Sequence, residues 1–428
     1  MNKSEDNRLR EFRQLKKEIR GSKNHLIIGI DIAKDKHHAF FGTPTGKTLF
    51  KRLVFENSIE GFEKLFIRVN ALKAQHALEE LVFGLEPTAN YHKPLAEHLI
   101  KSGHLVVMVA GESIKNNRKT LYGRWDSNDT KDSANVADLI SQGKCLFYEY
   151  PAMALRELRS LLSLKRRLKR QEHGLRVRIR NNLIAQYFPE LDKFFGNSEN
   201  QILSIVQWCL NPSVIAGMEY KDFAALVGPR LRTTSQRERL ERIWRLSVDS
   251  IGCEAGEALD FEGNILVQRL KQTREAIEAT DDKIEGICLE FPEYSYLLTI
   301  PGFGPGVASI VLGVIGNPFR FENGKQVIKM SGLDLCAERS GEGSDRAVPV
   351  ISKKGNANLR YALYQAAWIA SIRNQHFVVY FTEKLKGREK EKGIKTKMRV
   401  KMAAKMLIIA WTLMKKKEPF ASSYLYKD

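Results

Sequence analysis

Two acidic residues in the first quarter of the sequence each follow a short apolar run. Asp31 comes after residues 26–30 (LIIGI), and Glu86 comes after residues 81–85 (LVFGL). A carboxylate beside a buried strand is costly to desolvate unless it is paired, bound to a metal or placed at a strand end facing a cleft. We therefore expect Asp31 and Glu86 to lie side by side on neighbouring strands of one sheet.

Asp129 and Asp132 add a second pair of carboxylates at a helical spacing. Residues three apart on a helix share one face. Four carboxylates in one place would repel one another unless a divalent cation neutralises them, and oxygen ligands suit Mg²⁺ or Mn²⁺. Two such ions are a recurring device for phosphodiester cleavage and transfer. The predicted metal ligands are therefore Asp31, Glu86, Asp129 and Asp132.

Each acid taken singly also has a plain structural interpretation. Asp31 is near enough to Lys34 and Lys36 for a surface ion pair, and Glu86 before a proline is compatible with an ordinary strand end. Asp129 is of a residue type favoured at a helix N-cap. The joint pattern, in a chain of strong positive charge, favours the metal site.

A glycine-rich turn near residue 300 predicts contact with nucleic-acid phosphates. Residues 300–308 read IPGFGPGVA and lead into a helical pattern at 307–314. The turn resembles the hairpin of helix-hairpin-helix modules, in which glycines let backbone N–H groups and a helix N-terminus approach a phosphate. A tight turn that merely needs positive φ is the alternative. The residues concerned are Gly302, Gly304 and Gly306.

Ser340 lies between an arginine and a glycine in a stretch with little apolar patterning. It is either a plain loop serine or a nucleophile, if a base or a metal eases its deprotonation. A helix predicted from residue 358 to 369 would present its N-terminus to an anion. Three basic residues near it are predicted phosphate clamps: Lys353, Lys354 and Arg360.

The charge balance indicates a polyanionic partner. Lys and Arg number 69 against 50 Asp and Glu, a net charge of +19. Nucleic acid is the first expectation and an anionic membrane surface the second. One basic stretch is the helical pattern at 152–184, and another spans residues 384–417. In the first stretch we expect a phosphate-facing helix rather than a solvated face, with these contacts: Lys165, Arg166, Arg167, Arg170 and Arg176.

Composition excludes several classes. An apolar content of 43% argues against a disordered chain, and no run of about 18 apolar residues predicts a membrane span. Residues 1–20 are charged throughout and lack the apolar core of a secretion signal. The five cysteines are far apart, without a CxxC pair, which indicates neither a zinc motif nor a disulfide framework and fits a reducing cytoplasm.

The elements that must position these residues predict an α/β fold followed by helices. Strands are expected at 26–32, 36–41, 48–55, 81–85 and 104–109, and helices at 59–72, 93–101 and 131–141. Three strands and then alternating helices and strands is the order of an RNase H-like fold, with a doubly wound fold as the alternative. Domains are predicted at 1–150, 151–292 and 293–428.

Residues 198–292 have a mainly helical pattern. Leu270, Ile277, Ile284 and Phe291 recur every seven residues. So short a seam fits helix pairing or dimerisation, as in a coiled coil, and fits an ordinary amphipathic helix equally well.

Four motifs in this order resemble the DEDD transposases of the insertion-sequence 110 family. They are residues 29–34 (GIDIAK), 86–91 (EPTANY), 129–133 (DTKDS) and the block 300–360. Ala89 stands where the family usually has glycine, Ser133 where it has alanine, and Leu335 where it often has proline.

The resemblance implies a RuvC-like nuclease domain, a coiled-coil dimerisation region and a separate transposase domain. Asp31, Glu86, Asp129 and Asp132 would hold Mg²⁺, and Ser340 would attack DNA to form a phosphoserine link, with Ser331 as second candidate. It also implies a structured guide RNA, a homo-oligomer (dimer or tetramer), and a prokaryotic, cytoplasmic protein associated with the nucleoid.

Other classes fit parts of the sequence. A RuvC-like junction nuclease that uses water would need the four acids but not Ser340. A proofreading exonuclease usually has a second acid two residues after the first, where Ala33 stands here. An actin-like ATPase would leave the positive charge unexplained. A nucleic-acid-binding protein with inactive acids is the non-enzymatic alternative.

Overall fold

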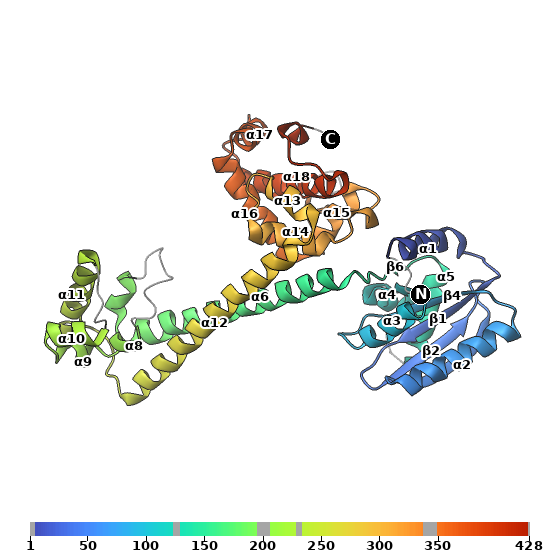
Figure 1. The fold of residues 1–428 in the computed structure, drawn as a ribbon, viewed down its shortest axis with the longest axis horizontal. Helices are drawn as coiled ribbons and strands as arrows, with labels where there is room; N and C mark the ends of the chain where they lie inside the picture. Colours follow the sequence, from blue (N-terminus) through green and yellow to red (C-terminus); the bar gives the residue numbers. More distant parts are fainter. Residues whose placement is uncertain (1–4, 123–128, 195–205, 228–232, 337–348, 427–428) are drawn as a thin grey trace. The chain divides into compact units, whose positions relative to one another are not determined.

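The computed structural model describes residues 5–122, 129–194, 206–227, 233–336 and 349–426. The chain divides into two compact units, Met1–Ala152 and Met153–Asp428. The first contains a mixed sheet and the second is almost entirely helical (Figure 1). Over the ranges just given, no helix has the length and apolar character needed to cross a membrane.

The sheet of the first unit has six strands in the order β3-β2-β1-β4-β5-β6. β1, β2 and β3 pair antiparallel, β1, β4 and β5 pair parallel, and β6 closes the sheet antiparallel. The bounds of β1 to β5 agree with the predicted strands within one residue, and β6 has no predicted counterpart. Their bounds are β1 His25–Asp31, β2 Lys36–Gly42, β3 Thr48–Glu56, β4 Glu80–Leu85, β5 Leu105–Met108 and β6 Leu146–Phe147.

Helices cover both faces of this sheet, which explains the continuous apolar run in β1. Leu26, Ile28 and Ile30 pack with α2 (Ile59–Gln75) and α3 (His92–Lys101). Ile27 points to the other face and packs with the remaining helices. Those helices are α1 (Glu5–Glu18), α4 (Gly111–Tyr122) and α5 (Asp129–Ser141). Because side chains alternate along a strand, a strand covered on both faces is apolar at every position.

Two glycines let α5 lie directly on the sheet. A Cβ on Gly29 of β1 would overlap the backbone oxygen of Ser133, and one on Gly84 of β4 would overlap Ile140. Gly29 and Gly84 are partners in the β1–β4 register, so both open the same patch. The helix that carries Asp132 is thereby fixed over the centre of the sheet.

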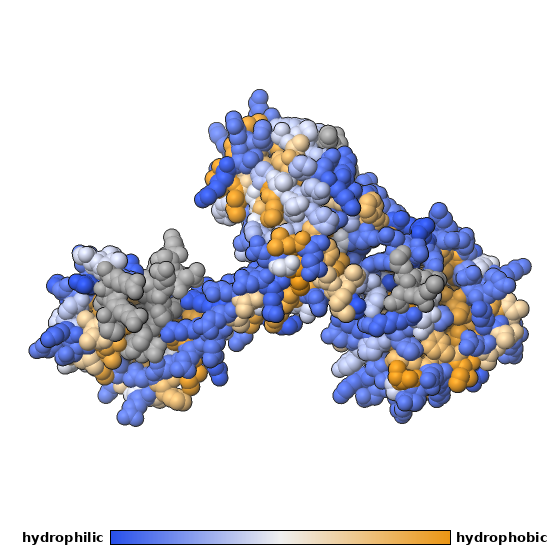
Figure 2. Space-filling model, in the orientation of Figure 1, coloured by the Kyte–Doolittle hydropathy of each residue, from blue (hydrophilic) through white to orange (hydrophobic). Residues whose placement is uncertain are grey.

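The second unit is organised by two long helices that pack along each other. α6 (Met153–Val177), which continues as a π-helix, η1 (Arg178–Ile184), packs against α12 (Glu257–Leu289). Arg274 pairs with Glu172 at 3.1 Å, and Lys165 pairs with Asp281 farther along, so the two helices run antiparallel. Figure 2 shows that the surface of this pair is mainly hydrophilic.

The seven-residue seam is buried inside the chain. Leu270, Ile277 and Ile284 of α12 are at most 5% exposed. Leu270 joins a core with Ile179 of η1, and Ile284 joins a core with Leu158 of α6. The seam therefore serves helix pairing within one chain, and a dimer would need another surface.

Each end of the α6–α12 pair carries a hydrophobic core formed by helices. One end holds α7 (Ala185–Tyr187), η2 (Pro189–Phe194), α8 (Val206–Cys209), α9 (Pro212–Ala216), α10 (Tyr220–Val227) and α11 (Thr234–Val248). The other holds α13 (Pro292–Leu298), α14 (Pro305–Ile315), η4 (Pro318–Arg320), α15 (Gly324–Ser331), the strand pair β7 (Leu335–Cys336) and β8 (Val350–Ile351), α16 (Ala357–Arg373), α17 (Gln375–Leu385), α18 (Ile394–Lys416) and η6 (Ser422–Leu425). The predicted domain boundary at residue 292 stays a prediction.

The last long helix of the chain is longer than its apolar pattern. The apolar residues at 406–414 predict a helix of that length, but α18 begins at Ile394. Part of the basic stretch therefore lies on the same helix, with Met402 and Ala403 already buried. The many basic residues in the first half of α18 make its apolar pattern hard to recognise in the sequence. One face of the helix nevertheless packs against the core in both halves.

We expect Gly29→Ala to lower the free energy of unfolding by about 1–3 kcal/mol, because the added methyl forces α5 away from β1. Urea unfolding followed by circular dichroism measures it. Gly286→Ala in α12 is the control, because a Cβ at this position would meet open space. This substitution should stabilise the helix by about 1 kcal/mol, since alanine has a higher helix propensity than glycine. A Gly29→Ala variant as stable as the parent protein would show that α5 does not rest on this glycine.

Candidate active site and nucleic-acid interface

The sheet places Asp31 and Glu86 at matching positions on adjacent parallel strands. Ile30 pairs with Leu85, so the next residues, Asp31 and Glu86, are one step farther along. Alternation sends Ile27, Gly29 and Asp31 to the face covered by α5. Gly84 meets Ile140 of α5, and the same alternation places Glu86 on that face too. Both predicted acids therefore point to the α5 side.

Asp132 belongs to the part of α5 that lies over these strand ends. It is 8% exposed and directly precedes Ser133, whose carbonyl lies against Gly29. Burial raises the pKa of Glu86 above its ordinary value, and the negative charge of Asp132 raises it further. A nearby cation, Arg118, opposes this rise. Glu86 and Asp132 are thus close enough to repel each other.

Arg118 of α4 is the counter-charge that the sequence patterns did not reveal. Its guanidinium donates a hydrogen bond to the carboxylate of Asp132 within an ion pair whose side chains are 15% and 12% exposed. Its Nε is buried and lacks a hydrogen-bond partner among the described groups. α4 also lies against Glu86, since a Cβ on Gly111 would come 2.7 Å from Glu86 Oε1.

Two predicted residues lie outside what the structure describes. Asp129 is the first residue of α5, but its side chain is not described, and Ser340 falls in residues 337–348. Among the side chains that are described, no three His, Cys, Asp or Glu residues form a group that could hold a metal ion. The structure thus brings Asp31, Glu86 and Asp132 to one face, and the four-carboxylate site stays a prediction.

Ser331, the second candidate nucleophile, is unsuited to that role. Its side chain is completely buried, and its hydroxyl donates a hydrogen bond to the carbonyl of Ile328 at 2.7 Å. The same oxygen accepts a hydrogen bond from the backbone N–H of Leu333. An attacking hydroxyl must reach its substrate, whereas the Ser331 hydroxyl is buried and hydrogen-bonded to the backbone at the end of α15.

The predicted phosphate clamps divide into two groups. Lys353 and Lys354 are exposed, whereas Arg360 donates a hydrogen bond to the carbonyl of Ser331 at 2.8 Å. The helix predicted from residue 358 begins one residue earlier, at Ala357, with Asn356 as its N-cap. The Arg360 side chain therefore has a structural contact, whereas Lys353 and Lys354 are exposed to solvent.

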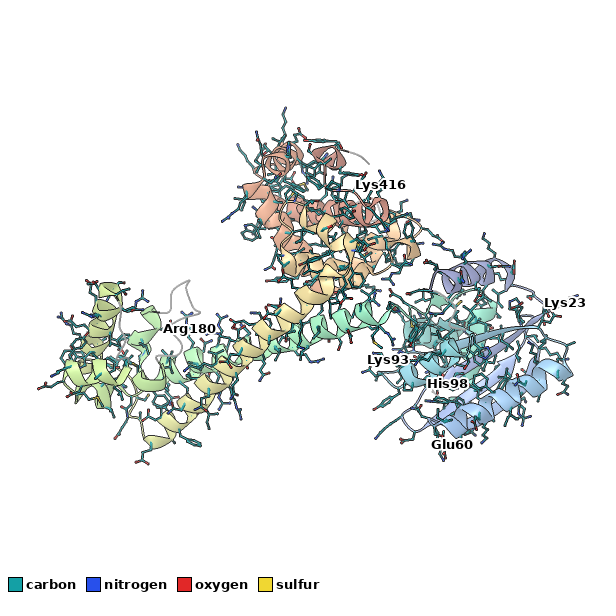
Figure 3. The ribbon with its side chains drawn as sticks, in the orientation of Figure 1. Lys23, Glu60, Lys93, His98, Arg180 and Lys416 are labelled. Carbon is teal, nitrogen blue, oxygen red and sulfur yellow. The ribbon has the colours of Figure 1, made fainter. Side chains whose placement is uncertain are left out.

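The basic stretch on α6 is more balanced than its sequence suggests. Glu157 and Glu172 are the acids within it, yet Lys165 pairs with Asp281 of α12. Arg180, which lies in η1 directly after α6 (Figure 3), pairs with Asp192 of η2. Acids distant in sequence therefore neutralise part of its charge. Several predicted contacts remain exposed: Arg166, Arg167 and Arg170. Arg176 is half-buried.

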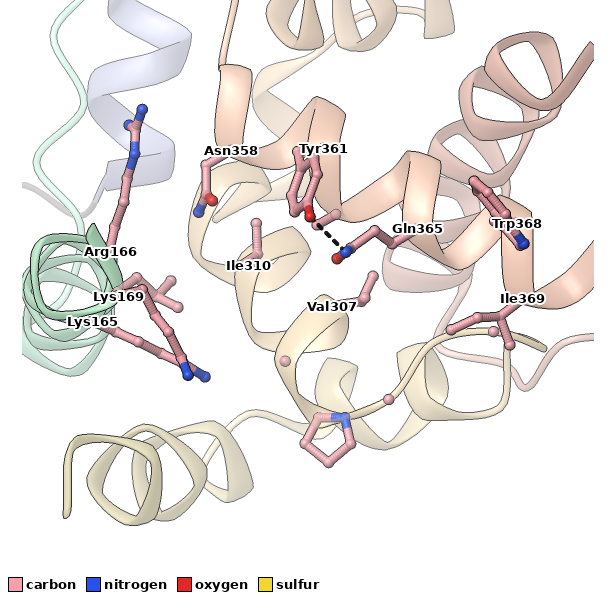
Figure 4. A pocket seen from close by; sticks show the side chains of 16 residues that line it. Lys165, Arg166, Lys169, Val307, Ile310, Asn358, Tyr361, Gln365, Trp368 and Ile369 are labelled. Atoms are coloured by element: carbon pink, nitrogen blue, oxygen red, sulfur yellow. Dashed lines mark hydrogen bonds between the residues drawn. The ribbon is translucent and has the colours of Figure 1, made fainter. Parts of the chain in front are cut away.

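A groove of about 860 Å³ joins two predicted nucleic-acid features (Figure 4). Lys165 and Arg166 of α6 lie on one side, and the glycine-rich turn before α14 lies on another. A third side is formed by α16. We call it the α6–α14–α16 groove.

The three glycines of this turn have different roles. Gly302 has φ +89°, and a Cβ there would overlap the carbonyl oxygen of Ala366, so this glycine is needed for packing on α16. Gly304 and Gly306 have open space where a Cβ would stand. Both are exposed and line the groove, so their backbone is approachable from it.

Some site features had weak signals in the sequence. Gly29 and Gly84 interrupt apolar strands, a position that often marks close approach of another backbone. Arg118 and the exposed aromatic residues of α16 had no such signal, because only the fold brings them to the carboxylates and to the groove.

Carboxylates gathered on one face of a sheet, followed by a basic helical unit, are typical of enzymes that act on the phosphodiesters of nucleic acids. Comparison with known proteins gives the particular family. The model of the IS110 DEDD transposases, described as "Transposase", matches residues 28–189, and that of the "Transposase IS116/IS110/IS902 family" matches residues 294–381. The chain belongs to the IS110 family of transposases, enzymes that cut and rejoin DNA.

Two relatives agree with this assignment. The "Insertion element IS110 uncharacterized 43.6 kDa protein" of Streptomyces coelicolor is 22% identical over 353 residues, which covers 80% of this chain and 83% of the relative. The protein y4rJ of Sinorhizobium fredii, which carries a provisional transposase name, is 33% identical over 124 residues, 28% of this chain and 30% of its own. The family resemblance inferred from the motifs is confirmed.

Replacing Glu86 should change stability in a pH-dependent way. Because the pKa of Glu86 is raised, the folded protein keeps the proton on this carboxyl to higher pH than the unfolded chain does. The stabilisation that comes from this proton is complete below about pH 4, and it is lost as the pH rises through the folded-state pKa. Glu86→Gln should therefore have a higher free energy of unfolding than the parent protein at pH 7. The difference should be less than about 1 kcal/mol, because the group is half-exposed. The gain should vanish near pH 4.

Chemical denaturation in EDTA at both pH values measures this difference. Glu63→Gln, at an exposed position of α2, is the control and should change little. A Glu86→Gln variant that is less stable than the parent at pH 7 would contradict the raised pKa of Glu86.

Proposed function

We propose that this transposase moves its insertion sequence by cutting DNA at a metal-dependent site of four carboxylates, Asp31, Glu86, Asp129 and Asp132. The main support is the register and alternation that turn Asp31 and Glu86 to the face where Asp132 lies. The strand order β3-β2-β1-β4-β5, with three antiparallel strands and then parallel ones, supports an RNase H-like, RuvC-type domain.

The donor set fits a hard divalent cation. All four side chains offer oxygen, as Mg²⁺ and Mn²⁺ prefer. Burial, and after it the negative charge of Asp132, raises the pKa of Glu86, and a bound cation would favour its charged form. When bound, such an ion would supply Lewis-acid polarisation of the scissile phosphate. Arg118, which pairs with Asp132, would have to release that carboxylate for the ion.

Ser340 is the proposed nucleophile. Its hydroxyl oxygen attacks the phosphorus, the hydroxyl proton passes to a base, and the bond to the leaving deoxyribose oxygen breaks. The product is a phosphoserine ester, which conserves the bond energy for rejoining. We place this serine and the carboxylates in different subunits of a dimer or tetramer, with contacts outside the buried α12 seam.

Nucleic-acid binding is assigned to exposed basic side chains and to the glycine turn. α13, the turn and α14 follow one another as in a helix-hairpin-helix module, and Gly304 and Gly306 leave its backbone accessible. Exposed α6 arginines and Lys353 and Lys354 would contact phosphates of DNA or of a structured guide RNA. Because its substrate is chromosomal DNA, we place the protein at the prokaryotic nucleoid.

Ser340→Ala should abolish covalent protein–DNA adducts and recombination while leaving DNA binding unchanged, because only the attacking oxygen is removed. Denaturing gels with labelled element-end DNA detect the adduct. Ser344→Ala, a nearby serine in the same stretch, is the control and should retain activity. Cleavage without an adduct in the parent protein would instead indicate a junction nuclease that uses water.

Asp31→Asn should lower DNA cleavage at least about a hundredfold, and EDTA should do the same to the parent protein, because the site would lose its cation. Binding of the same DNA should persist in both cases. Asp35→Asn, at an exposed position nearby, is the matched control. Cleavage that survives Asp31→Asn and EDTA would favour a site that does not depend on metal.

A further inference from the structure

The exposed face of α16 carries large apolar side chains along one helical stripe. Tyr361, Trp368 and Ile372 are 61%, 48% and 58% exposed. With Gln365 they follow one another at steps of four, three and four residues, which places them on one face. The opposite face packs into the core of the unit through Leu363 and its neighbours. Such a stripe on an otherwise packed helix indicates a binding surface.

Three residues of this stripe line the α6–α14–α16 groove, opposite the basic helix (Figure 4). Lys165, Arg166 and Lys169 of α6 line it too, and none of its lining residues is acidic. Lys165 pairs with Asp281 and Lys169 with Glu172. Arg166 is exposed and has no ion-pair partner among the described residues. The groove therefore has a cationic wall and an aromatic wall.

The two aromatic rings are held in place. Gln365 donates a hydrogen bond to the hydroxyl of Tyr361 at 2.8 Å, and the guanidinium of Arg399 lies over the ring of Trp368, 4.7 Å from its centroid. Tyr364 meets the same indole edge-on. The indole is thus supported by its neighbours while nearly half of its surface stays exposed. Preordered rings of this kind suit stacking with little loss of side-chain entropy.

The chemistry of the groove indicates bases as well as phosphates. Phosphate contacts would explain Arg166 and the open backbone at Gly304 and Gly306, but they would leave Tyr361 and Trp368 without a role. Aromatic side chains stack on bases whose faces are free, which single strands offer and a double helix does not. At about 860 Å³ the groove lies in the upper part of the range of ligand sites, about 300–1,000 Å³.

We propose that the α6–α14–α16 groove binds an unpaired segment of the DNA substrate, with bases stacked on Tyr361 and Trp368 and phosphates near Arg166 and the Gly304–Gly306 backbone. This inference deepens the proposed function, since it rests on DNA as the substrate, but it does not depend on the carboxylates or on Ser340. A strand opened during exchange is the segment that the groove would hold.

The test is binding of fluorescently labelled oligo(dT) to the full chain, measured by anisotropy in EDTA so that the metal site has no part in it. Trp368→Ala and Tyr361→Ala should each weaken single-strand binding by about 5- to 150-fold, the range for loss of one stacked base. Affinity for a duplex of equal length should stay the same, because other basic surfaces bind it.

Matched variants separate stacking from folding. Trp368→Phe and Tyr361→Phe keep an aromatic face and should restore most of the affinity. Phe319→Ala removes an aromatic side chain that is 51% exposed, near Lys415 and outside the groove, and should have no effect. Asp31→Asn should bind oligo(dT) normally, so that failure of the carboxylate site and failure of the groove give different results.

Four results would overturn the proposal. They are unchanged oligo(dT) affinity in both alanine variants, an equal loss of duplex affinity, equal or tighter binding of oligo(U), and a change of oligomeric state in Trp368→Ala seen by sedimentation. The last result would identify the aromatic stripe as a protein interface.

Discussion

The close contact of one helix with the centre of the sheet is the constraint on which the candidate active site depends. Gly29 and Gly84 are register partners, and neither has room for a methyl group beneath α5. Because α5 rests on both strands, Asp132 is held on the face to which Asp31 and Glu86 point. Burial at this place raises the pKa of Glu86, the negative charge of Asp132 raises it further, and Arg118 opposes both effects. Packing and electrostatics therefore oppose each other at this site.

In the second unit, too, the packing of helices decides which charged side chains stay exposed. The α6–α12 pair buries its apolar seam within the chain and joins two helical cores. Ion pairs such as Arg274–Glu172 link the two helices, so part of the basic charge of α6 is neutralised by its partner. The cations that remain exposed, with the glycine turn and α16, are those available to nucleic acid.

Much of the fold could be predicted from particular residues. The apolar runs in β1 and β4 located these two strands, because a sheet covered on both faces must be apolar throughout its central strands. β6, with only Leu146 and Phe147, is too short to give such a pattern. The burial of Ser331, the second candidate nucleophile, could not be predicted, because it depends on how α15 packs.

The sequence by itself determined the order of the elements, the positions of the acids at strand ends and the family, since these depend on local patterns and short motifs. The tertiary structure decided which residues meet. It paired Arg118 with Asp132, neutralised part of the α6 charge with Asp281, and placed Trp368 across a groove from Arg166. The physical reason is that these contacts join residues far apart in the chain, and only the packing of α4 on α5, of α12 on α6 and of α14 between α6 and α16 brings them together.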